Sequence, residues 1–164
     1  QLRANFETSH IPIILLTAQS DFSFKIEGLK TGADEYLTKP FHPKELIIRV
    51  ENILKNRGYS RHKFKEKEIL EPSEITFTSA DEILIQNAIA LVEKNMDFPE
   101  YAVDQFAQDL AVSRPSLFNK MRALTGETPK NFIKIIRLKR AAQLLKTGKL
   151  SVSEVCYMLS LIHI

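Results

Sequence analysis

The chain has 164 residues, of which 44% are hydrophobic and 26% are charged, and its formal net charge is +3. This composition is typical of an ordinary globular protein with enough apolar side chains for a core. Its single cysteine, Cys156, excludes an internal disulfide and is typical of a reducing compartment. Because the sequence has no apolar run long enough to span a bilayer and no leader pattern, we expect these residues to contact no membrane and to be cytoplasmic, either alone or as the cytoplasmic end of a membrane-anchored protein.

The first part of the sequence alternates between strand and helix patterns. Residues 11–18 form a short apolar run typical of a buried parallel strand, and a helix candidate follows over residues 22–31. A second short strand is predicted over residues 35–37. Residues 43–57 have apolar side chains at spacings of three and four, which predicts an amphipathic helix. This order indicates an α/β fold over residues 1–57.

The rest of the chain is predicted to be helical after a connector. Residues 58–80 mix acidic and basic side chains and contain few apolar ones, so we interpret them as a linker. Residues 81–164 then form the second predicted domain, which is all-α. Ser79 or Asp81 can cap a helix that runs to about residue 96, and further helices are predicted over residues 103–110 and 114–125. Thr128 and Pro129 begin a helix that runs to about residue 147, and a fifth helix begins at Ser151 or Ser153.

Two of these helices have the arrangement of a helix-turn-helix. A short helix ends near Leu110, a three-residue turn follows, and Ser113 caps the next helix. On that helix Leu117, Met121 and Leu124 share one face, which we expect to pack inward. The DNA-binding residues that we predict on the opposite face and its flanks are Arg114, Pro115, Ser116, Phe118, Asn119, Lys120 and Arg122.

The chemistry of this outward face suits double-stranded DNA. Asparagine can pair with adenine and arginine with guanine, while Phe118 can contact a thymine methyl group. Ten basic residues and one acidic residue, Glu127, lie between Ala111 and Lys149, a local excess that attracts a polyanion. The alternative is an unrelated helical hairpin with a solvated basic face, since the turn contains Ala111 and Val112 rather than a glycine.

Three segments of the helical region match a known family: SRPSLFNKMRALTGETPKNFI (residues 113–133), RLKRAAQLL (137–145) and SVSEVCYM (151–158). Through them, residues 81–159 resemble the DNA-binding region of AraC-type transcription regulators. The resemblance implies two helix-turn-helix units joined by a long helix, here residues 129–146, each unit placing one helix in the major groove. It also implies that Pro115, Phe118 and Asn119 face bases and that Arg122 lies nearer phosphate.

The resemblance stops before the second unit is complete. Residues 152–158 correspond to its first helix, but residues 159–164 do not continue the family pattern. We therefore expect a fragment with one complete helix-turn-helix unit, followed by an incomplete second unit and an unrelated segment, residues 159–164.

Two polar residues end the predicted strands of the first domain. Thr17 ends the first strand and Lys39 follows the second, so both should lie at the carboxyl edge of the sheet, where functional groups of α/β proteins gather. A hydroxyl and an ammonium group there would suit a phosphoryl group. Ordinary loop chemistry at a Lys-Pro step is the alternative.

Residues 9–57 resemble the C-terminal half of response regulator receiver domains, which have a flavodoxin-like fold. The matching segments are HIPIILLTA and GLKTGADEYLTKPF. The resemblance implies that Thr17 and Lys39 contact a phosphorylated aspartate, that the Lys39–Pro40 bond is cis, and that Tyr36 changes rotamer on phosphorylation. The phosphoacceptor and the acidic pair that binds Mg²⁺ belong to earlier strands of that family, so we expect no phosphoacceptor here and a need for Mg²⁺ only in a complete receiver.

A receiver joined to an AraC-type region resembles the C-terminal end of hybrid two-component sensors. We therefore expect a DNA-binding response regulator, the output end of a phosphorelay, with a histidine kinase region in the same parent chain and a homodimer as a further option. The alternative is a phosphorelay or protein-interaction module without DNA binding. We predict no enzyme activity, cofactor or metal in this fragment, since the scattered histidines do not form a metal site: His10, His42, His62 and His163.

Overall fold

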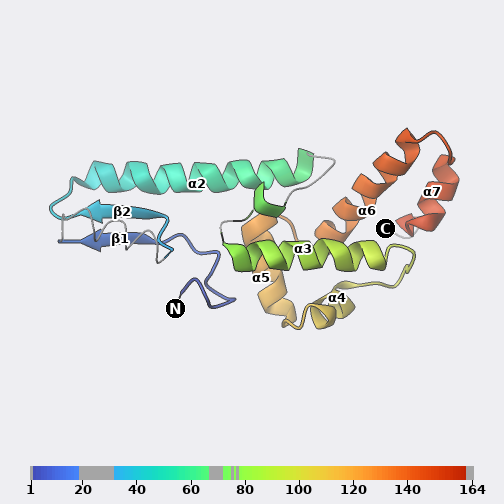
Figure 1. Ribbon diagram of the computed structural model, residues 1–164, viewed down its shortest axis with the longest axis horizontal. Coiled ribbons are helices and arrows are strands. Elements are labelled where there is room, and N and C mark those ends of the chain that lie inside the picture. The colour runs from blue at the N-terminus through green and yellow to red at the C-terminus, as the bar shows by residue number, and fades with distance from the viewer. Residues whose placement is uncertain (1, 19–31, 67–71, 75, 77, 162–164) are drawn as a thin grey trace. The chain divides into compact units, whose positions relative to one another are not determined.

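The computed structural model, drawn in Figure 1, describes residues 2–18, 32–66, 72–74, 76 and 78–161. The chain divides into two compact units, residues 1–59 and residues 60–164. The helix predicted over residues 22–31 lies outside the described residues. Of the helices in the described ranges, none is both long and apolar enough to cross a membrane.

The first unit contains two parallel strands and most of a helix. Strand β1 (Ile14–Thr17) pairs with β2 (Glu35–Thr38) in a register that places Thr17 opposite Thr38. Helix α2 (Pro43–Glu66) follows them. Both predicted strands are confirmed as a parallel pair, and a helix begins where the third element was predicted (Figure 1).

Charged groups hold the loops of this unit together. The Asp34 carboxylate pairs with the guanidinium of Arg3 and, at 3.3 Å, with that of Arg57. It also accepts a hydrogen bond of 2.7 Å from the backbone N–H of Ile13. Buried polar groups are stable only when such partners are present, so this cluster fixes the loop before β2. Several large apolar side chains stay exposed in this unit: Leu16, Ile47, Ile48, Val50 and Leu54.

The second unit is built from helices, as predicted. It begins with the last residues of α2 and a short 3₁₀ helix, η1 (Pro72–Glu74). The N-terminal cap of the first full helix is Thr78, rather than Ser79 or Asp81 as expected, and Ser113, Thr128 and Ser151 cap three later helices. The helices are α3 (Ser79–Lys94), α4 (Val103–Asp109), α5 (Arg114–Thr125), α6 (Pro129–Lys146) and α7 (Val152–Met158).

The structure differs from the expected linker at its start. Helix α2 does not end at residue 57 but continues to Glu66, and Phe64 is fully buried in the second unit. The Phe64 ring stacks on Phe132 of α6, with centroids 5.3 Å apart, and Phe132 lies 6.0 Å from Phe106 of α4. Burying one aromatic side chain contributes roughly 1.5–3 kcal/mol. The linker prediction rested on the mixed charge of residues 58–80, and it missed this stabilisation because a single residue, Phe64, provides it.

Candidate nucleic-acid interface

The turn between α4 and α5 is closed by backbone hydrogen bonds rather than by a glycine. The N–H of Val112 donates to the carbonyl of Ala107 at 3.0 Å, and that of Ala111 donates to Gln108 at 2.9 Å. Ala111 adopts a φ of 55°, in the left-handed region that glycine occupies without strain. The Ser113 side chain then accepts the N–H of Ser116 and caps α5.

Helix α5 is amphipathic in the way its spacing predicts. Leu117 and Met121 are fully buried and Leu124 is 2% exposed, so this face packs into the helical unit. Gly126, with a φ of 79°, ends the helix in a left-handed cap. The packing fixes which side chains remain on the outside.

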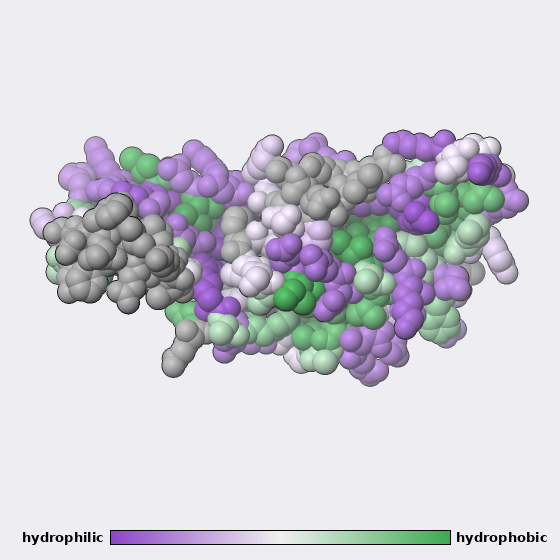
Figure 2. Space-filling model, in the orientation of Figure 1, coloured by the Kyte–Doolittle hydropathy of each residue, from purple (hydrophilic) through white to green (hydrophobic). Residues whose placement is uncertain are grey.

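The outward face of α5 presents an aromatic, an amide and a guanidinium group. Phe118 is 40% exposed, and Asn119 and Arg122 are exposed. The Arg122 guanidinium lies 5.8 Å from the centroid of the Phe118 ring, which is within cation–π range. The two residues are one helical turn apart on α5. On the face seen in Figure 2, hydrophilic residues surround scattered hydrophobic patches over the helical unit.

The first turn of α5 is tied to its neighbours. Arg114 is exposed and pairs with Asp104 of α4 at 3.1 Å, and Pro115 is exposed at the start of the helix. The Ser116 hydroxyl accepts from the Ser113 hydroxyl at 2.8 Å. The structure thus brings Arg114, Pro115, Phe118, Asn119 and Arg122 onto one accessible surface, while Ser116 has a capping contact.

Lys120 is not part of this surface, which corrects the prediction that it binds DNA. Its side chain is 2% exposed, and its ammonium group lies 2.8 Å from Asp81 of α3, which is 1% exposed. A buried lysine is stable only when it is paired, and Asp81 supplies that partner. Lys120 is three residues after Leu117 and one before Met121, so it lies beside the buried face of α5. This spacing could have predicted its burial from the sequence.

The positive surface is also smaller than the count of basic residues suggests. Arg137 of α6 is 2% exposed and donates to the backbone carbonyls of Phe98, at 2.9 Å, and Asn95, at 3.3 Å. It follows Ile133 by four positions and precedes Ala141 by four, both of which are buried. Like Lys120, it therefore belongs to the inner face of its helix. The count of basic residues between Ala111 and Lys149 included Lys120 and Arg137 as if both were on the surface.

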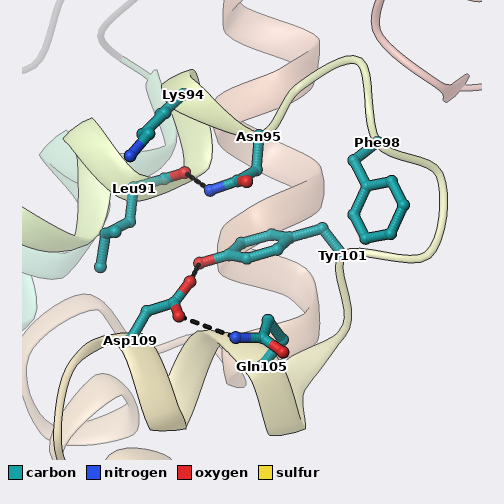
Figure 3. Close-up of a pocket in the computed structure, with 7 residues that line it drawn as sticks. All are labelled: Leu91, Lys94, Asn95, Phe98, Tyr101, Gln105 and Asp109. Atoms are coloured by element: carbon teal, nitrogen blue, oxygen red, sulfur yellow. Dashed lines mark hydrogen bonds between the residues drawn. The ribbon is translucent and has the colours of Figure 1, made fainter.

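A pocket lined by polar and apolar side chains lies between α3 and α4 (Figure 3). There the Tyr101 hydroxyl donates to one Asp109 oxygen at 2.9 Å, and the Gln105 amide donates to the other at 2.8 Å. Burial, together with the hydrogen bond to Asp109, raises the pKa of Tyr101 well above its usual range. Tyr101 therefore stays a proton donor and anchors the loop after α3. At the start of that loop, the side-chain amide of Asn95 donates a hydrogen bond to the backbone carbonyl of Leu91.

In the first unit, the structure brings the ends of both strands together as expected. The backbone N–H of Lys39 donates to the carbonyl of Thr17 at 2.7 Å, so both residues lie at the same edge of the sheet. The Lys39–Pro40 bond is cis, and Tyr36 is buried, with 6% of its surface exposed. Lys39 itself is exposed.

Two family models match the chain where these two sites lie. The model described as a response regulator receiver domain matches residues 1–51, and the model described as a helix-turn-helix domain matches residues 106–160. These matches agree with the two regions that the resemblances predicted, a receiver region followed by a helix-turn-helix region.

Curated relatives share one or both regions. "Histidine kinase P4" of Formosa agariphila is 48% identical over 96% of this chain, which covers 12% of that protein. The "DNA-binding dual master transcriptional regulator RpaA" of Synechocystis is 29% identical over 84% of this chain and 56% of its own length. The "Phosphate regulon transcriptional regulatory protein PhoB" of Pseudomonas aeruginosa is 47% identical over 35% of this chain and 25% of its own. No solved structure matches the chain.

Proposed function

We propose that this chain is the DNA-binding output region of a two-component system and acts as a sequence-specific transcription regulator. The observation that carries the proposal is the outward face of α5, where Phe118, Asn119 and Arg122 are exposed beside a helix-turn-helix core. Asparagine is well suited to read base edges and arginine to bind phosphate oxygens, and in helix-turn-helix proteins the N-terminal residues of the second helix enter the major groove. We assign Arg114 and Arg122 to phosphate contacts and Phe118 and Asn119 to base contacts, with Pro115 alongside them.

We further propose that the parent protein is a hybrid kinase, either cytoplasmic or membrane-anchored. The part of it that corresponds to this chain would have no enzyme activity of its own. The chain spans 12% of the histidine kinase relative and about half of the RpaA relative, so the rest of the parent would supply the kinase, the phosphoacceptor and the acidic pair for Mg²⁺. In that setting Thr17, Tyr36 and Lys39 would read the phosphorylation state of the receiver. Dimerisation on DNA is part of the same proposal.

Binding of the full chain to a random-sequence DNA duplex, over about 50–200 mM salt, tests the function. The expected result is an affinity that falls steeply with salt, since phosphate contacts release counterions. A chain that does not bind, or that binds with no salt dependence, would favour the second candidate, a protein-interaction module of the phosphorelay. The exposed apolar side chains of the first unit are the observation that favours that candidate.

A further inference from the structure

A second cavity of the helical unit is lined by cations and is distinct from the α5 face. It has a volume of about 280 Å³ and lies between the segment after residue 98 and the first half of α6. Lys130, Lys134 and Arg137 project from successive turns of α6 and line one side. None of the described residues that line it belongs to α5.

The cations of this cavity have no acidic partner among the residues that the structure describes. Lys130 and Lys134 are exposed and make no ion pair there. Arg137 is 2% exposed, and although one of its terminal nitrogens donates to two carbonyls, its Nε has no hydrogen-bond partner in the described part of the chain. A buried guanidinium without a counter-charge is destabilising, and burial accordingly lowers the pKa of Arg137. An anion in the cavity would supply the counter-charge that Arg137 lacks.

The rest of the cavity lining is apolar. Val103 and Ile133 contribute aliphatic surface, and Tyr101 contributes its ring, because its hydroxyl is engaged by Asp109. A cavity that pairs a few polar groups with apolar walls is the usual form of a small-molecule site. The volume exceeds that of a bare phosphate, which leaves room for a compact apolar part of the ligand.

We propose that this cavity binds a phosphate group with a compact apolar part, the phosphate lying among Lys130, Lys134 and Arg137 and the apolar part lying against Tyr101, Val103 and Ile133. Three converging cations favour a phosphate, which carries up to two negative charges, over a carboxylate. The ligand is either a free phosphate monoester or a sugar-phosphate unit of the DNA backbone. This site goes beyond the proposed reading of bases by α5 and does not depend on it.

Titration of the full chain with phenyl phosphate, followed by NMR, tests the site. Saturable binding at about 1 mM or tighter is expected, with a shift of the Arg137 Nε–H signal and of amide signals around residues 101–103. The Lys130→Met, Lys134→Met double variant should weaken binding by about tenfold or more. The matched control is Lys146→Met with Lys149→Met, two exposed lysines outside the cavity, which should leave the affinity unchanged.

Failure of phenyl phosphate to saturate, or equal loss in the two double variants, would overturn the proposal. Because the titration contains no DNA, it gives a result even if the chain binds no duplex. Adding a DNA duplex then separates the sources: displacement of phenyl phosphate assigns the site to a backbone phosphate, and simultaneous binding assigns it to a free phosphate monoester. Either result supports a phosphate site.

Discussion

Lys120 of α5 and Asp81 at the start of α3 form an ion pair, 2.8 Å between charged atoms, that is almost completely buried. It joins the second helix of the helix-turn-helix to α3, the first long helix wholly within the unit. Because a buried pair tolerates little displacement, we infer that it fixes the rotation of α5 about its axis and so the set of side chains on the outward face.

Removing one partner of this pair should be strongly destabilising. Lys120→Met removes the ammonium partner of the buried Asp81 carboxylate and should lower the free energy of unfolding by about 3–5 kcal/mol in urea titrations. Adding Asp81→Leu should restore most of the loss, because both charges are then gone. Lys130→Met, at an exposed position, is the control and should change stability by less than about 0.5 kcal/mol. A single variant as stable as the parent chain would contradict the burial of the pair.

The left-handed Ala111 offers a stabilising substitution. Ala111→Gly should raise the free energy of unfolding by roughly 0.5–1 kcal/mol, since glycine adopts a φ of 55° without the steric strain of a Cβ. Thermal or urea unfolding measures the change. Ala90→Gly, in the exposed interior of α3, should have the opposite sign, because glycine weakens a helix. Destabilisation by both substitutions would show that Ala111 is not strained.

The end of α2 should matter for the stability of the helical unit. Phe64→Ala removes a fully buried ring that stacks on Phe132 and should cost about 3–5 kcal/mol. Phe98→Ala, at a residue 49% exposed, should cost far less. Urea unfolding of the full chain, followed by circular dichroism, compares the two. If both variants were equally stable, residues 60–66 would be a linker after all.

Glu127 should make stability depend on pH. Its carboxylate accepts a hydrogen bond from Lys65 at 2.7 Å, and this contact, helped by Asn131, lowers the pKa of Glu127. A lowered pKa in the folded state stabilises the fold above the ordinary glutamate pKa of about 4.3, and this stabilisation is lost as the pH falls through the lowered value.

Glu127→Gln should therefore be less stable than the parent chain at neutral pH, and the difference should shrink below about pH 4.3. Urea midpoints measured across this range provide the comparison. Glu93→Gln, at an exposed position of α3, is the control and should leave the profile unchanged. A stability difference that is the same at every pH would show that the charge of Glu127 is not involved.

Base and phosphate contacts should separate by mutation. Once a preferred sequence has been selected from a random duplex pool, Asn119→Ala should reduce the preference for it, because an amide that reads a base edge is lost. Arg122→Ala should weaken binding to every sequence and lower the salt slope by about one, because a phosphate contact is lost. Equal loss of preference from the two substitutions would contradict this assignment.

The local features of this protein could be predicted from the sequence because they depend on neighbouring residues. Caps at Ser113 and Thr128 and the inward stripe of Leu117, Met121 and Leu124 follow from hydrogen bonding and helical periodicity within one segment. The outward position of Phe118, Asn119 and Arg122 on α5 could be predicted for the same reason, since they lie away from the stripe.

Only the tertiary structure decided which charged and apolar residues outside that stripe are buried. Lys120 depends on Asp81, and Arg137 depends on carbonyls 39 and 42 positions earlier in the chain. Phe64 is buried because Phe132, far along the chain, supplies a ring to stack on. The helix-turn-helix was thus determined by sequence alone, whereas its true positive surface and the cation-lined cavity were set by contacts between distant segments, which no local pattern encodes.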